Sequence, residues 1–217
     1  MAIKLRSVRS DTNTRFEDIQ LILDLLNEEK KNGQPIPKSS KVDCQLILKS
    51  SIMLMIYNVI EGTMSNLLTE FFDIIVMKKI SINNLPNQLQ ITIYTYYLKN
   101  IGEDPKKLKE FRTYDEIMLC DISYLNITKY LKLFSGNLDS RQIRSISKKL
   151  GINLPSGIDE PILLTIKNNR NKLAHGETRF RNTCQDMTTE TIIKMCSKVK
   201  LYLENVITSY ENFLETL

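Results

Sequence analysis

CQLILKSSIMLMIYNVIEG, residues 44–62, decides the fold together with its apolar continuation to Lys79. Apolar residues recur in this stretch at three- and four-residue steps, which is the period of an α-helix. They are Leu46, Met53, Ile56, Ile60, Leu67, Phe71 and Ile74. We expect one long helix over 41–79. Because this helix is apolar on more than one side, it should lie at the centre of the protein.

The same run reads as a buried helix rather than a membrane span. Lys49 and Glu61 interrupt it, and it falls short of about 20 clean apolar residues. The opening sequence, MAIKLRSVRSDTNTRFEDIQ, has no apolar segment of the kind that a secretory signal requires. We therefore expect a cytoplasmic protein with no membrane partner.

Helical patterns extend to both sides of this stretch. Residues 11–31 carry one apolar stripe, which ends at Asn32-Gly33 and two prolines. Residues 85–101 are ambiguous, because their Ile, Thr and Tyr favour a strand while Pro86 fits a helix start. We interpret this segment as a helix.

Three more helices are expected in the second half of the chain. The first covers 140–150, with Asp139 as its N-cap and Gly151 as its C-terminal stop. The others run from about 160 to 175 and from about 188 to 217, the latter with one continuous apolar face.

These elements predict the all-α class. The architecture we expect is an up-and-down helical bundle around the helices at 41–79, 160–175 and 188–217, with an additional N-terminal helix that caps it. We divide the chain into a helical extension, 1–40, and a helical domain, 41–217. The length of 217 residues, with 42% hydrophobic residues, suits one core.

Residue counts exclude several kinds of site. One histidine, His175, cannot form a multi-histidine metal site, and the four cysteines (Cys44, Cys120, Cys184 and Cys196) form no CxxC pair. The phosphate-loop, dinucleotide, serine-elbow and EF-hand motifs are also missing. We expect no metal and no cofactor.

Positive charge is concentrated in one part of the chain. Residues 129–182 hold eleven Lys or Arg against four Asp or Glu, a net +7, whereas the remainder is −2. Such a patch suits a polyanion such as RNA, DNA or a nucleotide. Cations on solvated helix faces are the simpler alternative.

A polar cluster at 167–175, KNNRNKLAH, occupies a helix that should be burying apolar residues. Asn171 and His175 are four residues apart and share a helix face, with Arg170 beside them. Arginine offers a fork suited to phosphate oxygens, and an imidazole titrates near neutral pH. The pair suits metal-free cleavage of a phosphodiester, although a six-residue polar pattern also arises by chance.

The segment RNKLAHGE, residues 170–177, resembles the signature of the HEPN superfamily, an RxxxxH motif with a polar residue after the arginine. Residues 57–62, 134–138 and 150–152 resemble the bacterial branch found in toxin and phage-defence loci. The similarity covers roughly 42–217, so the domain is HEPN-like.

The resemblance implies a helical domain that forms a homodimer and brings both RxxxxH motifs into one cleft, frequently as a metal-independent endoribonuclease. It also implies a toxin or abortive-infection effector, with an antitoxin or defence-system protein as partner. A dimer would supply the second imidazole that one chain lacks, because an isologous interface repeats each residue.

On this hypothesis Arg170 stabilises the charge on phosphorus, His175 promotes attack by the 2′-hydroxyl of RNA, and Asn171 positions the reactants. The products are a 2′,3′-cyclic phosphate and a 5′-hydroxyl. Supporting roles go to nearby residues: Lys172, Lys167, Arg179 and Arg181 as RNA-backbone contacts, and Glu61 as a partner that holds Arg170. Solvated cations and a boundary carboxylate are the alternatives.

Two other functions remain open. A catalytically silent HEPN module would bind RNA or a nucleotide, or dimerise within a defence complex. Modification of a tyrosine near the motif by a partner nucleotidyltransferase has less support, since the nearest downstream tyrosine is Tyr202. A tyrosine cluster, Tyr94, Tyr96 and Tyr97, would stack on bases or, more simply, pack in the core.

Overall fold

The computed structural model describes residues 5–28, 38–103, 113–119, 137–155 and 160–217. These residues are helical and contain no strand, which confirms the all-α fold class. The elements are α1 (Arg6–Glu28), α2 (Lys38–Met77), η1 (Ile82–Asn84), α3 (Asn87–Glu103), α4 (Tyr114–Met118), α6 (Ser140–Lys149), α7 (Glu160–Ala174), α8 (Phe180–Thr183) and α9 (Thr189–Glu215). The turn at 32–37, residues 134–136 and Cys120 lie outside the described residues.

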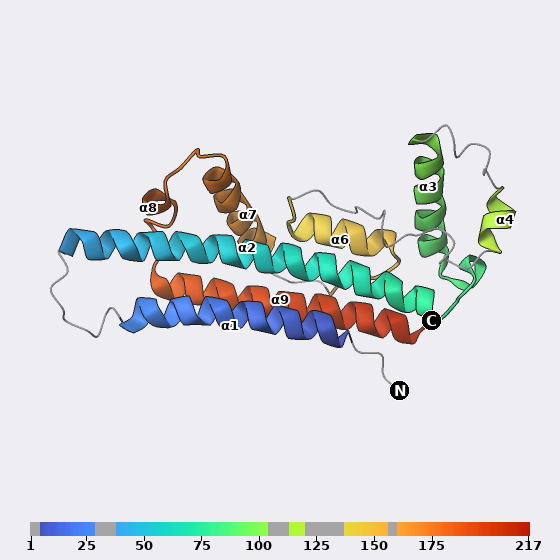
Figure 1. The fold of residues 1–217 in the computed structure, drawn as a ribbon, viewed down its shortest axis with the longest axis horizontal. Helices are drawn as coiled ribbons and strands as arrows, with labels where there is room; N and C mark the ends of the chain where they lie inside the picture. Colours follow the sequence, from blue (N-terminus) through green and yellow to red (C-terminus); the bar gives the residue numbers. More distant parts are fainter. Residues whose placement is uncertain (1–4, 29–37, 104–112, 120–136, 156–159) are drawn as a thin grey trace.

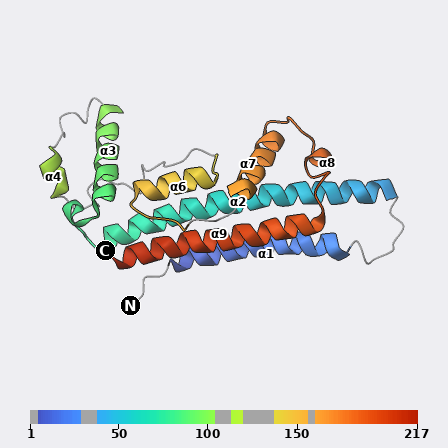
Figure 2. The ribbon, with the colours of Figure 1, turned by 180° about the vertical axis from the view of Figure 1, so that it is seen from behind.

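Three long helices, α1, α2 and α9, lie side by side and form the body of the molecule (Figure 1). Helices α6, α7 and α8 lie on the other side of α2 from α1, and the view from behind shows the same layering (Figure 2). Helices α3 and α4 stand at one end. The third long helix is therefore α1 rather than the expected 160–175 segment, because α7 is short and leaves α2 at an angle.

Helix α2 is central because it contacts helices on both sides. It packs against α1 and α9 on one side and against α7 and α8 on the other. Met53, Ile56, Ile60, Leu67 and Phe71 are buried, as the sequence predicts. By length and composition, 40–77 would also pass as a membrane span, as core helices of soluble proteins do. Its neighbours in the bundle account for this apolarity.

Helix α1 packs along α2 and α9 instead of capping the bundle. It begins at Arg6, earlier than the expected residue 11, because Val8 and Thr12 already face the core. The Thr12 and Thr63 hydroxyl groups are 2.9 Å apart and join α1 to α2. The boundary at residue 40 stays a prediction, although the buried residues of α1 share one core with the rest of the bundle.

The helix-end signals read from the sequence are present. The Asp139 carboxylate accepts a hydrogen bond from the backbone N–H of Gln142 at 3.0 Å and caps α6. Gly151, at φ +81°, ends the same helix in the left-handed conformation that favours glycine. The 85–101 segment is helical, because Leu89 and Ile93 are buried and outweigh the strand preference of its side chains.

The tyrosine cluster of α3 packs within the protein. The rings of Tyr94 and Tyr97 stack with centroids 6.2 Å apart, and Tyr94 meets Tyr114 of α4 edge-to-face at 4.9 Å. These contacts join α3 to α4. A role of Tyr94, Tyr96 or Tyr97 in base stacking stays a prediction.

An ion pair joins the start of α1 to the end of α9. The Glu211 carboxylate accepts bonds from the Leu5 backbone N–H at 3.0 Å and from Arg9 Nε and Nη2 at 3.0 and 2.6 Å. The bond from Arg9 to Glu211 raises the pKa of the guanidinium above its ordinary value. Glu211 is only 9% exposed, so these bonds are largely shielded from water.

Replacing Glu211 with glutamine should lower the free energy of unfolding by about 1.5–3 kcal/mol, the scale of a lost charged hydrogen bond. An amide keeps the shape but removes the charge and places N–H groups against Arg9. Urea denaturation measures the effect, with Glu215→Gln at an exposed position as the control. Equal stability of the two variants would contradict this account.

Candidate active site

The polar cluster lies on the C-terminal half of α7, whose end points away from the three long helices (Figure 1). The Gly176 N–H donates to the Leu173 carbonyl at 3.2 Å, and the Glu177 N–H donates to the Lys172 carbonyl at 2.9 Å. Gly176 has φ +70°, so this is the Schellman termination that glycine permits. His175 lies directly after the last residue of α7, Ala174, and its side chain is exposed.

Arg170 and Asn171 are joined to the segment before α6. Arg170 Nη1 donates to Asn171 Oδ1 at 3.0 Å, and Asn171 Nδ2 donates to Asn137 Oδ1 at 2.9 Å. A guanidinium has no acceptor atom, so the Asn171 amide must present its oxygen to Arg170 and its nitrogen to Asn137. The sequence pattern anticipated Arg170 with Asn171 but gave Asn137 no role.

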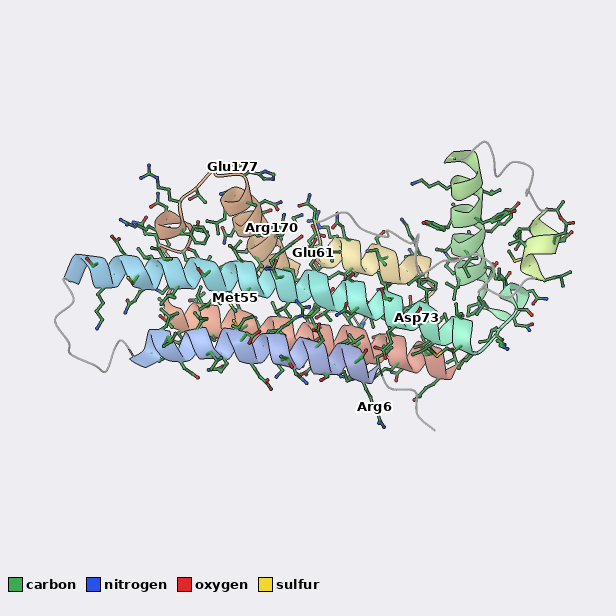
Figure 3. The ribbon with its side chains drawn as sticks, in the orientation of Figure 1. Arg6, Met55, Glu61, Asp73, Arg170 and Glu177 are labelled. Carbon is green, nitrogen blue, oxygen red and sulfur yellow. The ribbon has the colours of Figure 1, made fainter. Side chains whose placement is uncertain are left out.

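The Arg170 guanidinium also lies over an aromatic ring of α2. Its Cζ is 4.6 Å from the centroid of the Tyr57 ring, which is a cation–π distance. Figure 3 shows the position of Arg170 on α7. The Tyr57 hydroxyl accepts a bond from the Leu138 backbone N–H at 3.1 Å and donates to Glu61 Oε1 at 3.4 Å. Burial, aided by the Glu61 carboxylate, raises the pKa of Tyr57, so the hydroxyl keeps its proton near neutral pH.

A direct pairing of Glu61 with Arg170 stays a prediction. The Glu61 carboxylate accepts a hydrogen bond from the Tyr57 hydroxyl, one helical turn earlier on α2. Tyr57 contacts both groups, because its hydroxyl bonds Glu61 and its ring lies under the Arg170 guanidinium. The sequence pattern gave no sign of the contact between Glu61 and Tyr57.

His175 and Arg170 are five residues apart, which in an α-helix is about 140° of rotation and about 7.5 Å of rise. Arg170 is half-buried against Tyr57, whereas His175 is exposed at the end of the helix. In one chain, therefore, the Arg170 guanidinium is fixed by its contacts, whereas the His175 imidazole is exposed to solvent on a different side of the helix.

The chain matches one family model, described as HEPN_MAE_28990-like HEPN, over residues 5–216. The chain belongs to the HEPN superfamily. No curated protein and no solved structure matches it. The matched range includes α1 and so extends beyond the 42–217 resemblance read from the motifs. HEPN domains are often ribonucleases or nucleotide-binding modules.

Lys167 of this HEPN domain forms an ion pair instead of extending into solvent. Its Nζ is 2.6 Å from Asp139 Oδ2, and the two side chains are 18% and 11% exposed. Burial disfavours the Asp139 carboxylate, but the bonds from Lys167 and the α6 backbone lower its pKa overall. The pair fixes α7 to the N-terminus of α6, next to Asn137. A contact of Lys167 with RNA stays a prediction.

Acid should weaken this part of the HEPN fold. The folded-state pKa of Asp139 is below its unfolded value, so its stabilisation is present above that value, about 3.9, and is lost as the pH falls further. Urea midpoints measured between pH 7 and pH 3 should fall less steeply for Asp139→Asn than for wild type. Lys167→Met should flatten the profile in the same way, and three identical slopes would contradict the assignment.

The remaining predicted cations lie in the last turn of α7 and in or next to α8. Lys172 and Arg179 are exposed, and Arg181 Nη1 pairs with Asp43 Oδ2 of α2 at 2.8 Å. The α8 segment is fixed to α2, since Ser50 Oγ donates to the Phe180 carbonyl at 2.6 Å. The cations thus lie on the same side of α2 as the RxxxxH motif.

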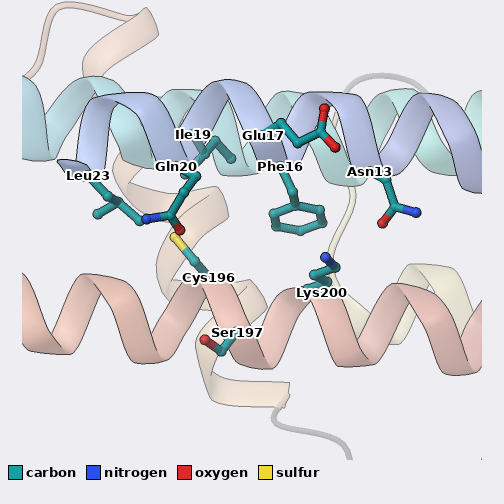
Figure 4. A pocket seen from close by; sticks show the side chains of 9 residues that line it. All are labelled: Asn13, Phe16, Glu17, Ile19, Gln20, Leu23, Cys196, Ser197 and Lys200. Carbon is teal, nitrogen blue, oxygen red and sulfur yellow. The ribbon is translucent and has the colours of Figure 1, made fainter. Parts of the chain in front are cut away.

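A groove of about 390 Å³ lies elsewhere, between α1 and α9 (Figure 4). Its lining includes Phe16, Leu23, Cys196 and Lys200, and Lys200 Nζ is 5.8 Å from the Phe16 ring centroid. Burial raises the pKa of Cys196 to about 12, so the thiol stays protonated near neutral pH. The groove holds none of the predicted site residues, and its cysteine is not an activated nucleophile.

Sequence reasoning assigned no role to Tyr57 or Asn137. Both lie in segments that resemble the HEPN family, 57–62 and 134–138, and this was the one available signal. Their partners are 81 and 34 residues away along the chain, so local periodicity carries no information about them.

Proposed function

We propose that this HEPN protein is a metal-independent endoribonuclease whose active site forms from the α7 motifs of two copies. The observation that carries the proposal is the complete RxxxxH motif, with Arg170 held by Asn171 and Tyr57 and with His175 exposed at the helix end. An arginine whose orientation is restricted can bind a phosphate in one position. An exposed imidazole can be reached by a second copy of the chain and by the substrate.

The proposed reaction is transesterification within RNA. An imidazole of His175 accepts the proton of the 2′-hydroxyl as its oxygen attacks phosphorus. Arg170 stabilises the negative charge on the non-bridging oxygens, and the bond to the 5′-oxygen breaks. A protonated imidazole returns a proton to that oxygen. The products are a 2′,3′-cyclic phosphate and a 5′-hydroxyl, and DNA, which lacks the attacking group, is spared.

The need for separate acid and base supports a homodimer. Each chain has one histidine, and a two-fold interface through the end of α7 would supply two. The exposed side chain of His175 at the end of that helix makes this end available for such an interface. Lys172 and Arg179, with Lys167 and Arg181 when released from their ion pairs, would contact the RNA backbone.

The cellular role that fits is a cytoplasmic toxin or abortive-infection effector restrained by an antitoxin or another defence protein. Unrestrained cleavage of cellular RNA is harmful to the cell that makes the enzyme. The restraint is expected to act on the shared α7 cleft, since blocking it would silence both copies of the motif.

The test is to incubate the purified protein with transfer RNA and total RNA in excess EDTA and to map the product ends. Cyclic-phosphate ends, with DNA of the same sequence intact, would support the proposal. Cleavage that EDTA abolishes, or cleavage of DNA at the same rate, would overturn the mechanism. A folded dimer that binds RNA without cutting it would favour the silent RNA-binding module.

A further inference from the structure

We infer that Tyr57 is a positioning residue, which holds Arg170 and Asn171 in one closed circuit of contacts. The Tyr57 ring contacts Arg170, Arg170 bonds Asn171, and Asn171 bonds Asn137. Asn137 is followed by Leu138, whose N–H returns to the Tyr57 hydroxyl. The circuit joins α2, α7 and the segment before α6. This inference deepens the proposed function and rests on it for the effect on cleavage.

The ring of Tyr57 restricts the guanidinium. An arginine side chain loses rotamer entropy when it is fixed at a phosphate, and contacts that already restrict it reduce this loss. Tyr57 is fully buried, so the surrounding side chains hold its ring in place next to Arg170. The Asn171 side chain accepts a hydrogen bond from Nη1 of the same guanidinium. The contact with the ring and the hydrogen bond at Nη1 together restrict the orientation of the guanidinium.

The hydroxyl of Tyr57 fixes the other half of the circuit. The bond from Leu138 N–H to the hydroxyl is buried, so water cannot replace it without cost. The proton of the hydroxyl goes to Glu61, because the Leu138 N–H already occupies an acceptor site. This bond sets the backbone next to Asn137 and therefore the position of the amide that holds Asn171.

Two substitutions separate the ring from the hydroxyl. Tyr57→Phe keeps the ring and removes the bonds to Leu138 and Glu61, whereas Tyr57→Leu removes the ring as well. The matched control is Tyr210→Phe, at a fully buried tyrosine whose hydroxyl is 3.1 Å from Ser147 Oγ. It loses a buried hydroxyl of the same kind outside the circuit. Thermal melting establishes that each variant is folded.

The first readout needs no cleavage. Arg170 Nε–H, assigned by its disappearance in Arg170→Lys, should be displaced in the NMR spectrum by the ring current of Tyr57. It should move to the position of solvent-exposed arginines in Tyr57→Leu and stay displaced in Tyr57→Phe. The side-chain amide of Asn171 should shift in both variants. Neither signal should move in Tyr210→Phe.

The second readout is steady-state cleavage of RNA. We expect kcat to fall about 100-fold in Tyr57→Leu, the scale of a misplacement of roughly 1 Å, and about tenfold in Tyr57→Phe. KM should change less than about twofold, because Arg170 acts on charge that develops in the transition state. A variant that is merely less stable would instead be rescued in kcat by cooling, and Tyr210→Phe would show the same loss.

The outcomes are distinguishable. An Arg170 signal that is unchanged in Tyr57→Leu overturns the inference whether or not the protein cuts RNA. A signal that moves in a protein without nuclease activity supports the positioning role and overturns the proposed function. If Tyr57→Leu does not fold, Asn137→Ala at an exposed position takes its place, and an unmoved Asn171 amide refutes the circuit.

Discussion

Replacing His175 with alanine is expected to reduce RNA cleavage by about 10³-fold or more while leaving the protein folded. Loss of a general acid–base group typically costs about 10²–10⁴ in rate, and here one residue type would supply both the acid and the base. His175 is exposed and lies at the end of α7, so its side chain holds no part of the core. The measurement is the cleavage rate of transfer RNA in EDTA, with thermal melting alongside.

Lys194→Ala is the matched control for this prediction. Lys194 is another exposed helix residue, paired only with Glu190 on the surface of α9 among the described residues, and its loss should change the rate less than twofold. Full activity of His175→Ala would contradict the proposed mechanism. A melting temperature lowered by many degrees would show instead that His175 has a structural role.

The same variant tests whether the cleft is shared between two copies. In a mixed dimer of one wild-type and one His175→Ala chain, both arginines remain but only one histidine. If the acid and the base come from two copies in one cleft, this dimer should lose far more than half of the wild-type rate. Separately tagged chains allow the mixed species to be purified. A mixed dimer that keeps about half of the wild-type rate would mean that each copy acts alone.

Replacing Phe71 with alanine should lower the free energy of unfolding by about 3–5 kcal/mol, the cost of removing a buried aromatic side chain. Phe71 is fully buried between α2 and α9. Its ring centroid is 5.1 Å from Phe72, 5.3 Å from Tyr210 and 5.9 Å from Phe213. Total stabilities are commonly 5–15 kcal/mol, so this loss is a large share.

Urea denaturation measures this effect as a lower midpoint with an unchanged slope. Phe71→Leu, which refills most of the space, should cost clearly less. Leu201→Ala, at a residue that is 59% exposed, should stay within about 0.5 kcal/mol of wild type. A cost below 1 kcal/mol for Phe71→Ala would contradict the view that this aromatic cluster joins α2 to α9.

The sequence by itself determined the long helices and several of the helix ends. Apolar residues at a period of 3.6 specify α2 and α9 because each long helix must bury a continuous face, and that requirement is local. Asp139, Gly151 and Gly176 mark helix ends through bonds to backbone groups within one turn. The motif from Arg170 to His175 is also local, and it identified the HEPN family together with the place of the candidate site.

Only the tertiary structure decided which side chains meet. Tyr57 reaches Leu138 across 81 residues, and Lys167 reaches Asp139 across 28. Such contacts depend on how α7 crosses α2, and this crossing is set by the packing of the whole core rather than by any one segment. The same packing decides that α1 lies along α2 and α9. The periodicity of a helix predicts which of its faces is buried, but it does not predict which helix packs against that face.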